Sequence, residues 1–223
     1  GAVSLPVARF SDEMRQVLES QGELVLSRVR DQAESAGIHC HTELRNGVPA
    51  TEIVEAAQDQ DLIVLGRSGE SSQVEERRGL GAVAERVLRS SEKPVFVAPD
   101  WFQEPKRILL GYDGSERAQA AMRFAAELAR SLALPLTAVS VSDDHDVALR
   151  RLEEVARHAE THDLRVERLA LTGDPAAALL DAATEGDLIA MGSFGEGRIR
   201  EWFLGSTTEA VLRHARQPVL LHR

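Results

Sequence analysis

The sequence has a single cysteine, no long apolar run and no excess of basic residues, and each shortage excludes a class of function. Cys40 is the only cysteine among 223 residues, so the chain cannot form an internal disulfide, which suits a reducing compartment. Lys and Arg number 26 against 36 Asp and Glu, and the net charge of −10 disfavours sequence-independent binding to nucleic acid or an anionic membrane. No apolar run approaches the roughly 18 residues of a membrane-spanning helix, and no signal-peptide pattern opens the chain. We therefore expect a cytoplasmic protein without nucleic-acid or membrane partners.

The chain repeats itself. Residues 47–69 align with 173–195 at an offset of 126, and ten of the 23 positions are identical. Residues 81–95 align with 205–219 at an offset of 124, with seven of 15 identical, so the first copy has two extra residues between its glycine pairs. A polar, proline-containing segment at 98–107 separates the copies. The sequence therefore predicts a tandem duplication, with domains at 1–100 and 105–223.

The second copy alternates short apolar runs with amphipathic segments. We expect a helix capped by Ser115 and another that Pro175 opens at its first position. The expected strands are 107–113, 136–141, 164–171, 187–192 and 218–222, with helices between them. Alternating strands and helices predict an α/β fold, an open five-stranded parallel sheet of Rossmann-like type in each copy.

The first copy lacks the strand–helix–strand that opens the second. A helix over about 12–36 and a strand over 38–44 are expected, followed by the remaining elements of the repeat. Roughly 40 residues are missing by comparison with the second copy. We expect that the recorded sequence starts late, although a partner could instead complete the sheet.

Glycines cluster between the fourth strand and the last helix of the second copy. They follow the pattern Gly192-x2-Gly195-x9-Gly205, and Ser206 and Thr207 come next. A glycine at a strand end lets an anion approach the backbone, and a helix N-terminus offers free N–H groups and a favourable dipole to phosphate. A flexible surface loop capped by Ser206 is the alternative interpretation.

The sequence resembles the universal stress protein family, which often occurs as tandem pairs of adenine-nucleotide α-hydrolase-like domains. Nucleotide-binding members carry Gly-x2-Gly-x9-Gly-(Ser/Thr) after the fourth strand and an Asp at the end of the first strand, here Asp113. The resemblance implies that Asp113 lies near the ribose and that the backbone of Val141 meets adenine. It also implies that ATP, ADP or AMP, with or without Mg²⁺, is held at its phosphates by Met191, Gly192, Gly195, Gly205, Ser206 and Thr207.

In the first copy the loop runs Gly66-x2-Gly69-x11-Gly81-Ala82, with longer spacing and without the hydroxyl. We expect this half to bind nucleotide weakly or not at all. The fifth strands of the copies, 93–99 and 217–222, are expected to be sheet edges. In the family two domains associate through this edge, which implies an internal pseudo-dimer, and a homodimer of two chains is a further expectation.

Other clusters have simpler interpretations than metal binding or catalysis. Cys40 aligns with Val166 of the repeat and is expected in the core, with His39 and His41 on a solvated face. The acidic run 143–146 fits a helix start better than a magnesium site. Arg198 and Arg200 could clamp phosphates or be ordinary loop charges, and Trp202-Phe203 could pack under the loop or against another subunit. We predict no metal site.

Three functions remain open at this point. The leading hypothesis is a nucleotide-binding regulatory protein, and Asp113 is interpreted as a ligand-orienting group because no nucleophile or second acid accompanies it. A stress-associated interaction module that binds no nucleotide is the second. An enzyme is the third, at most a slow ATPase or a related adenine-binding enzyme. A dinucleotide dehydrogenase is disfavoured, since no G-x-G-x-x-G follows the first strand.

Overall fold

The computed structural model describes residues 5–69, 80–193 and 205–223, with side chains from residue 14 onward. The chain forms two compact units, residues 1–48 and 49–223. The second unit combines the latter part of the first repeat with the whole second repeat. No helix in the part of the chain described is long and apolar enough to span a membrane.

The first unit consists of helix α1 (Leu5–Ser35) and an extended segment that follows it. The predicted helix is confirmed, with an earlier start. The predicted strand over 38–44 is wrong, because these residues have no regular secondary structure. The reason lies in strand pairing. Among the described strands, the equivalent strand of the second copy, β5 (Val166–Leu171), bonds only to β4 (Leu136–Val141), and no described strand takes the place of β4 beside residues 38–44. Without a neighbour, a strand cannot satisfy its backbone groups by pairing.

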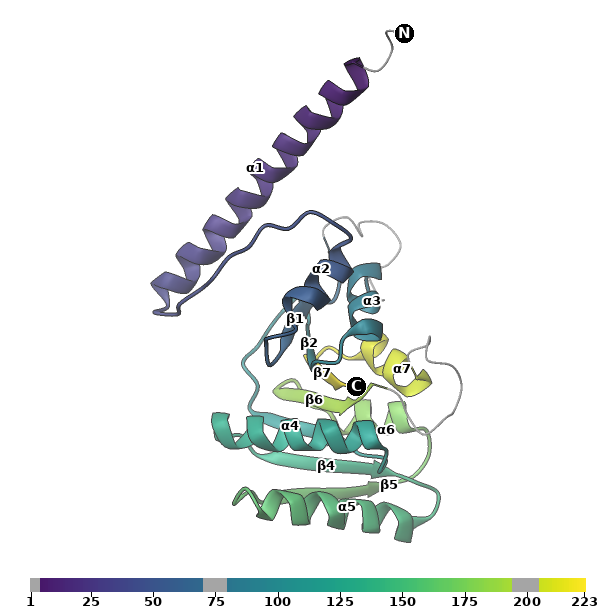
Figure 1. Cartoon of the computed structure of the whole chain (residues 1–223). Helices are drawn as coiled ribbons and strands as arrows, with labels where there is room; N and C mark the ends of the chain where they lie inside the picture. The colour runs from purple at the N-terminus through teal and green to yellow at the C-terminus, as the bar shows by residue number, and fades with distance from the viewer. Residues whose placement is uncertain (1–4, 70–79, 194–204) are drawn as a thin grey trace. The chain divides into compact units, whose positions relative to one another are not determined.

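The second unit is a seven-stranded sheet with the order β1-β2-β7-β6-β3-β4-β5 (Figure 1). All neighbouring strands run parallel except β2 and β7, which pair antiparallel with Val95 opposite Leu221 and Val97 opposite Val219. The remaining strands are β1 (Ile63–Gly66), β2 (Val95–Ala98), β3 (Arg107–Gly111), β6 (Asp187–Gly192) and β7 (Val219–His222). The expected α/β fold is confirmed, and the strands of both copies form one continuous sheet.

Helices cover both faces of this sheet. The buried residues of α4 (Glu116–Leu132) and α5 (His145–Glu160) form one core with alternate strand residues such as Ile108 and Leu110. The intervening strand residues, such as Leu109 and Ile189, belong to a second core on the opposite face. That core is shared with α2 (Pro49–Ala56), α3 (Ala82–Ser90), α6 (Pro175–Ala182) and α7 (Ser206–His214). The twofold period of the strands thus assigns each side chain to one of two cores.

The helix starts expected from sequence are confirmed. Ser115 Oγ accepts a hydrogen bond from Ala118 N at 3.2 Å, which caps α4. Pro175 lies in the first turn of α6, capped by Asp174. The acidic run at 143–146 supplies the cap of α5, where Asp144 Oδ1 accepts from two backbone N–H groups.

The two copies differ in how well their strands are covered. Val64 of β1 is 62% exposed, whereas its repeat counterpart Ala190 of β6 is 0% exposed. In the second copy this face is covered by α4, which packs on β6. The described residues of the second unit include no first-copy counterpart of α4, so Val64 faces solvent.

Candidate functional site

A pocket lies at the carboxyl ends of β3, β4 and β6. Its empty space is about 610 Å³, including the part open to solvent. This is where ligands bind in open parallel sheets. Its lining residues are Gly111, Tyr112, Asp113, Ala118, Val139, Val141, Pro175, Leu179, Met191, Gly192, Thr207 and Thr208.

Asp113 is held in place by the turn between β3 and α4. Its Oδ1 accepts a hydrogen bond from Ser115 N at 2.9 Å, and Gly114 between them adopts a φ of +85°, a conformation that favours glycine. Oδ2 forms no hydrogen bond with the described residues, and the residue is half-buried. Asp113 therefore keeps one acceptor oxygen for a ligand.

Tyr112 forms part of the pocket wall and is 3% exposed. Burial raises the pKa of its phenol, and the neighbouring Glu154 carboxylate raises that pKa further. Tyr112 consequently stays neutral at physiological pH. Among the described lining residues, Asp113 is then the only charged group.

Gly192 is required by packing as well as by the pocket. A Cβ at this position would lie 2.8 Å from Ala118 N and 2.9 Å from Arg117 C, both backbone atoms at the start of α4. Its carbonyl accepts a long hydrogen bond, 3.5 Å, from Thr208 Oγ1 of α7. Gly192 thus lets the end of β6 contact the first turns of two helices.

The first turn of α7 has no side-chain cap among the described residues. Its N-cap is Gly205, which has no side chain to bond the first N–H groups, whereas side chains cap α4, α5 and α6. The unsatisfied N–H groups and the helix dipole favour an anion at this end. Thr207 and Thr208 place this turn at the pocket.

Most of the residues expected from sequence come together here. Asp113, Val141, Met191, Gly192 and Thr207 all line the pocket, although they come from distant parts of the chain. Gly205 and Ser206 lie at the start of α7 outside the lining, and Ser206 is exposed. Gly195, Arg198, Arg200 and Trp202-Phe203 lie outside the described residues.

Several lining residues were not expected from sequence. Pro175 and Leu179 stand one helical turn apart in α6, and Val139 precedes Val141 by two residues in β4, so that both valines face the same side of the sheet. A spacing of four residues in a helix and of two residues in a strand could have indicated that the members of each pair share a face. Tyr112 and Ala118 had no comparable signal.

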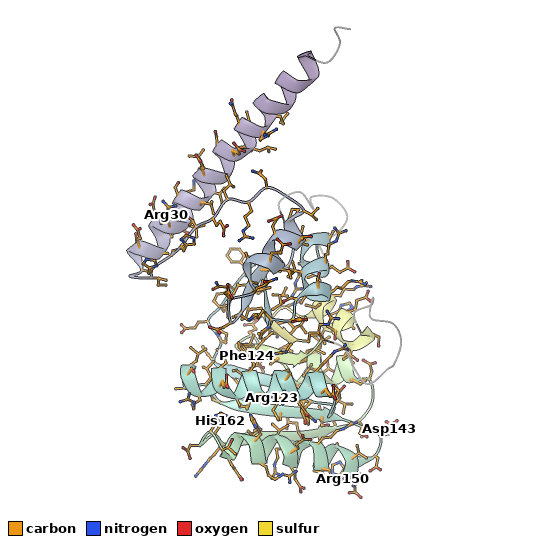
Figure 2. The ribbon with its side chains drawn as sticks, viewed as in Figure 1. Arg30, Arg123, Phe124, Asp143, Arg150 and His162 are labelled. Atoms are coloured by element: carbon orange, nitrogen blue, oxygen red, sulfur yellow. The ribbon has the colours of Figure 1, made fainter. Side chains whose placement is uncertain are left out.

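The other sequence clusters contribute no residue to the lining of this pocket. Cys40 is half-buried, and His39 and His41 are exposed. Asp143 points outward from the loop after β4 (Figure 2) and is exposed. Across the described ranges, no group of three or more His, Cys, Asp or Glu side chains is arranged to hold a metal ion.

The described residues of the first copy supply only part of the corresponding site. Gly81, like Gly205, is the N-cap of its helix without a side-chain hydrogen bond. The described residues include no first-copy counterparts of β3, β4, α4 and the turn between β3 and α4, however, which together contribute half of the lining in the second copy. Part of the first-copy loop, 70–79, lies outside the described residues.

The profile of the universal stress protein family matches the chain twice, over residues 2–99 and 104–223. Universal stress protein Slr1230 of Synechocystis is 32% identical over 208 residues, covering 91% of this chain and 72% of that protein. Universal stress protein Rv2005c of Mycobacterium tuberculosis is 28% identical, and the alignment covers 95% of this chain and 77% of that protein. The crystal structure of a universal stress protein from Archaeoglobus fulgidus matches with a TM-score of 0.76 and 26% identity, covering 95% of this chain and 81% of that one. The chain therefore belongs to the universal stress protein family.

Proposed function

We propose that residues 105–223 bind an adenine nucleotide, ATP, ADP or AMP, in the pocket at the carboxyl ends of β3, β4 and β6. The observation that carries this proposal is the convergence of Asp113, Val141, Met191, Gly192 and Thr207 on one pocket from four separate segments. The N-terminus of α7, which no described side chain caps, supports the proposal because such an end favours a phosphate.

The lining suits the three parts of a nucleotide. Val139, Val141 and Leu179 offer apolar surface to a planar base. The free oxygen of Asp113 can accept hydrogen bonds from ribose hydroxyls. The N–H groups of α7 can then donate to phosphate oxygens, with Gly195, Gly205 and Ser206 extending this contact along the loop.

The pocket favours binding over catalysis, so we propose a regulatory role in the cytoplasm. Asp113 is the only charged group among the described lining residues, and no nucleophile stands beside a base. An interaction module without a nucleotide is the second candidate. The antiparallel β2–β7 pairing supports our proposal that the two halves form an internal pseudo-dimer.

Calorimetric titration of the full chain with ATP, ADP and AMP tests the nucleotide proposal. We expect saturable binding of one equivalent, abolished by Gly205→Val, whose side chain obstructs the N-terminus of α7. Gly81→Val makes the same change at the equivalent helix of the first copy and should leave binding intact. Thermal unfolding confirms that both variants fold.

Three results would contradict the proposed nucleotide binding, its location in the second copy or the regulatory role. Absence of binding to the wild type favours the interaction module. Equal loss in Gly81→Val and Gly205→Val contradicts the assignment to the second copy. Phosphate release at enzyme-like rates, lost in Asp113→Ala, replaces the regulatory role with an enzymatic one.

A further inference from the structure

Strand β1 forms one end of the seven-stranded sheet, and β5 forms the other. Among the described strands β1 pairs only with β2, so one of its edges has no neighbour. The fifth strands of the two copies, β2 and β7, pair with each other and each has a further neighbour on its other side. Their edges are thus used within the chain, and another chain can extend the sheet only at β1 or β5.

The two ends of the sheet differ in charge. The β5 strand carries Glu167 and Arg168, both exposed, and charged side chains on an edge strand disfavour its pairing with another chain. The β1 strand has the sequence Ile-Val-Leu-Gly, without a charged residue or a proline. Val64, in its middle, is 62% exposed. Of the two ends, β1 is therefore the one whose sequence permits pairing.

The backbone of β1 presents hydrogen-bonding groups to this open edge. Ile63 N donates to Pro94 O at 2.9 Å, on the side of β2. In a parallel pair the N–H and C=O groups of one residue point to the same side, and those of the next residue point to the opposite side. The backbone groups of Leu62, Val64 and Gly66 therefore point toward the open edge, where an additional strand would pair with them.

Apolar side chains lie beside the same edge. Val64 stands opposite Phe96 of β2 in the strand register, and the Phe96 ring meets the Phe102 ring edge-on, with centroids 6.1 Å apart. Phe102 is itself 56% exposed. The edge of β1 thus combines unpaired backbone groups with exposed apolar surface, and such a combination favours strand addition.

Antiparallel pairing of two β1 strands about a twofold axis at Val64 engages all of the outward backbone groups. Val64 then lies opposite Val64 of the second chain, in a pair that exchanges hydrogen bonds, and Leu62 lies opposite Gly66. The flanking residues Asp61 and Arg67 also fall opposite each other, so the register brings no like charges together. A twofold interface requires this kind of self-complementarity.

We propose that two copies of this chain pair antiparallel through β1, with Val64 on the twofold axis, and so join their sheets into one. The β2–β7 pair already joins the strands of the two repeats in the antiparallel direction. Because β1 has only four residues, the interface is small and the dimer dissociates on dilution. The proposal does not depend on the nucleotide pocket.

Sedimentation equilibrium of the full chain under reducing conditions, over a range of concentrations, measures the dimer. Val64→Glu and Val64→Lys each place like charges opposite each other across the axis, so each should weaken dimerisation at least about tenfold. An equimolar mixture of the two variants should recover dimerisation, because opposite charges then meet. Leu149 of α5, which is 42% exposed, provides the matched control, and Leu149→Glu and Leu149→Lys should leave the dimer unchanged.

Disulfide cross-linking tests the same register without adding charge. The only cysteine of the chain, Cys40, is first replaced by serine. In that background Val64→Cys should form a disulfide between two chains under mild oxidation, because Cα atoms of a hydrogen-bonded antiparallel pair lie about 5.5 Å apart. Leu149→Cys in the same background should cross-link at least about tenfold more slowly, since its α5 position is not opposite itself in the dimer.

Four results would overturn the proposal. The first is a wild type that stays monomeric at every concentration. The second is a dimer that Val64→Glu and Val64→Lys form as readily as the wild type, since another surface then joins the chains. The third is a mixture of these variants that does not recover dimerisation although circular dichroism shows both to be folded. The fourth, which decides the matter if the charged variants do not fold, is equal cross-linking of Val64→Cys and Leu149→Cys.

Discussion

Gly192→Ala tests whether the glycine at the end of β6 is required by packing rather than only by a ligand. The added methyl group would lie 2.8 Å from Ala118 N and 2.9 Å from Arg117 C. Both are backbone atoms of α4, so no side-chain rotation relieves the contact. The start of α4 must shift away from the sheet, together with the Ser115 cap and the Asp113 turn.

The expected loss of stability in Gly192→Ala follows from comparison with Gly66, the equivalent glycine of the first copy. Among the described residues, a Cβ at Gly66 would meet only Ser68 O, at 3.5 Å, which is ordinary contact. Replacing glycine within a strand stabilises the backbone by about 0.5–1 kcal/mol at either position. Overpacking at Gly192 costs about 1–3 kcal/mol. We therefore expect Gly192→Ala to be less stable than Gly66→Ala by about 1–3 kcal/mol, the overpacking term alone, because the backbone gain is common to both variants.

Urea denaturation followed by far-ultraviolet circular dichroism, without nucleotide, measures the free energy of unfolding of both variants. The wild type is measured alongside them. If Gly192→Ala and Gly66→Ala are equally stable, the contact between β6 and α4 does not constrain Gly192. The conformation of the glycine loop in the presence of ligand would then be its main requirement.

Two further predictions concern buried titratable groups. Burial opposes ionisation of Asp187, but hydrogen bonds from Arg107 and Thr184 outweigh it and hold its pKa below the usual range. The stability from this pair is complete above the unfolded pKa of about 3.9 and is lost as pH falls through the folded pKa. Asp187→Asn should cost about 2–4 kcal/mol at neutral pH and progressively less below about pH 3.9. Urea denaturation at several pH values would disprove this if the cost stays constant. The pKa of His158 is lowered by burial, then by His162 and by Arg123 (both labelled in Figure 2), against an opposing effect of Glu127. The neutral form of His158 favours folding above the unfolded pKa of about 6.5. The wild type should therefore lose stability relative to His158→Gln as the pH falls below that value. Parallel curves of stability against pH for the two proteins would contradict this.

Much of the second repeat could be predicted because its signals are local. Ser115, Asp144 and Asp174 cap helices through hydrogen bonds to residues two or three positions away. Short apolar runs indicated parallel strands, and parallel strands place their carboxyl ends at one edge of the sheet. That rule placed the glycine at the end of the fourth strand near a ligand edge, whereas the resemblance to the family implied the places of Asp113 and Val141.

Other features depend on groups far apart in the sequence, and these could not be predicted. Residues 38–44 have the pattern of a strand but no neighbour to pair with. Thr207 lines the pocket while Ser206 does not, because successive residues of a helix point about 100° apart and the packing of α7 selects the face.

The sequence by itself determined the internal repeat and the order of helices and strands in the second copy, since these follow from aligned residues, periodicity and capping. Only the tertiary structure decided which residues of that motif line one pocket and that β2 and β7 join both repeats in one sheet. It also decided the different surroundings of two similar side chains. Arg107 pairs with the buried carboxylate of Asp187, whereas Arg67 lies beside a cavity. The surroundings of each guanidinium depend on which groups the fold places next to it.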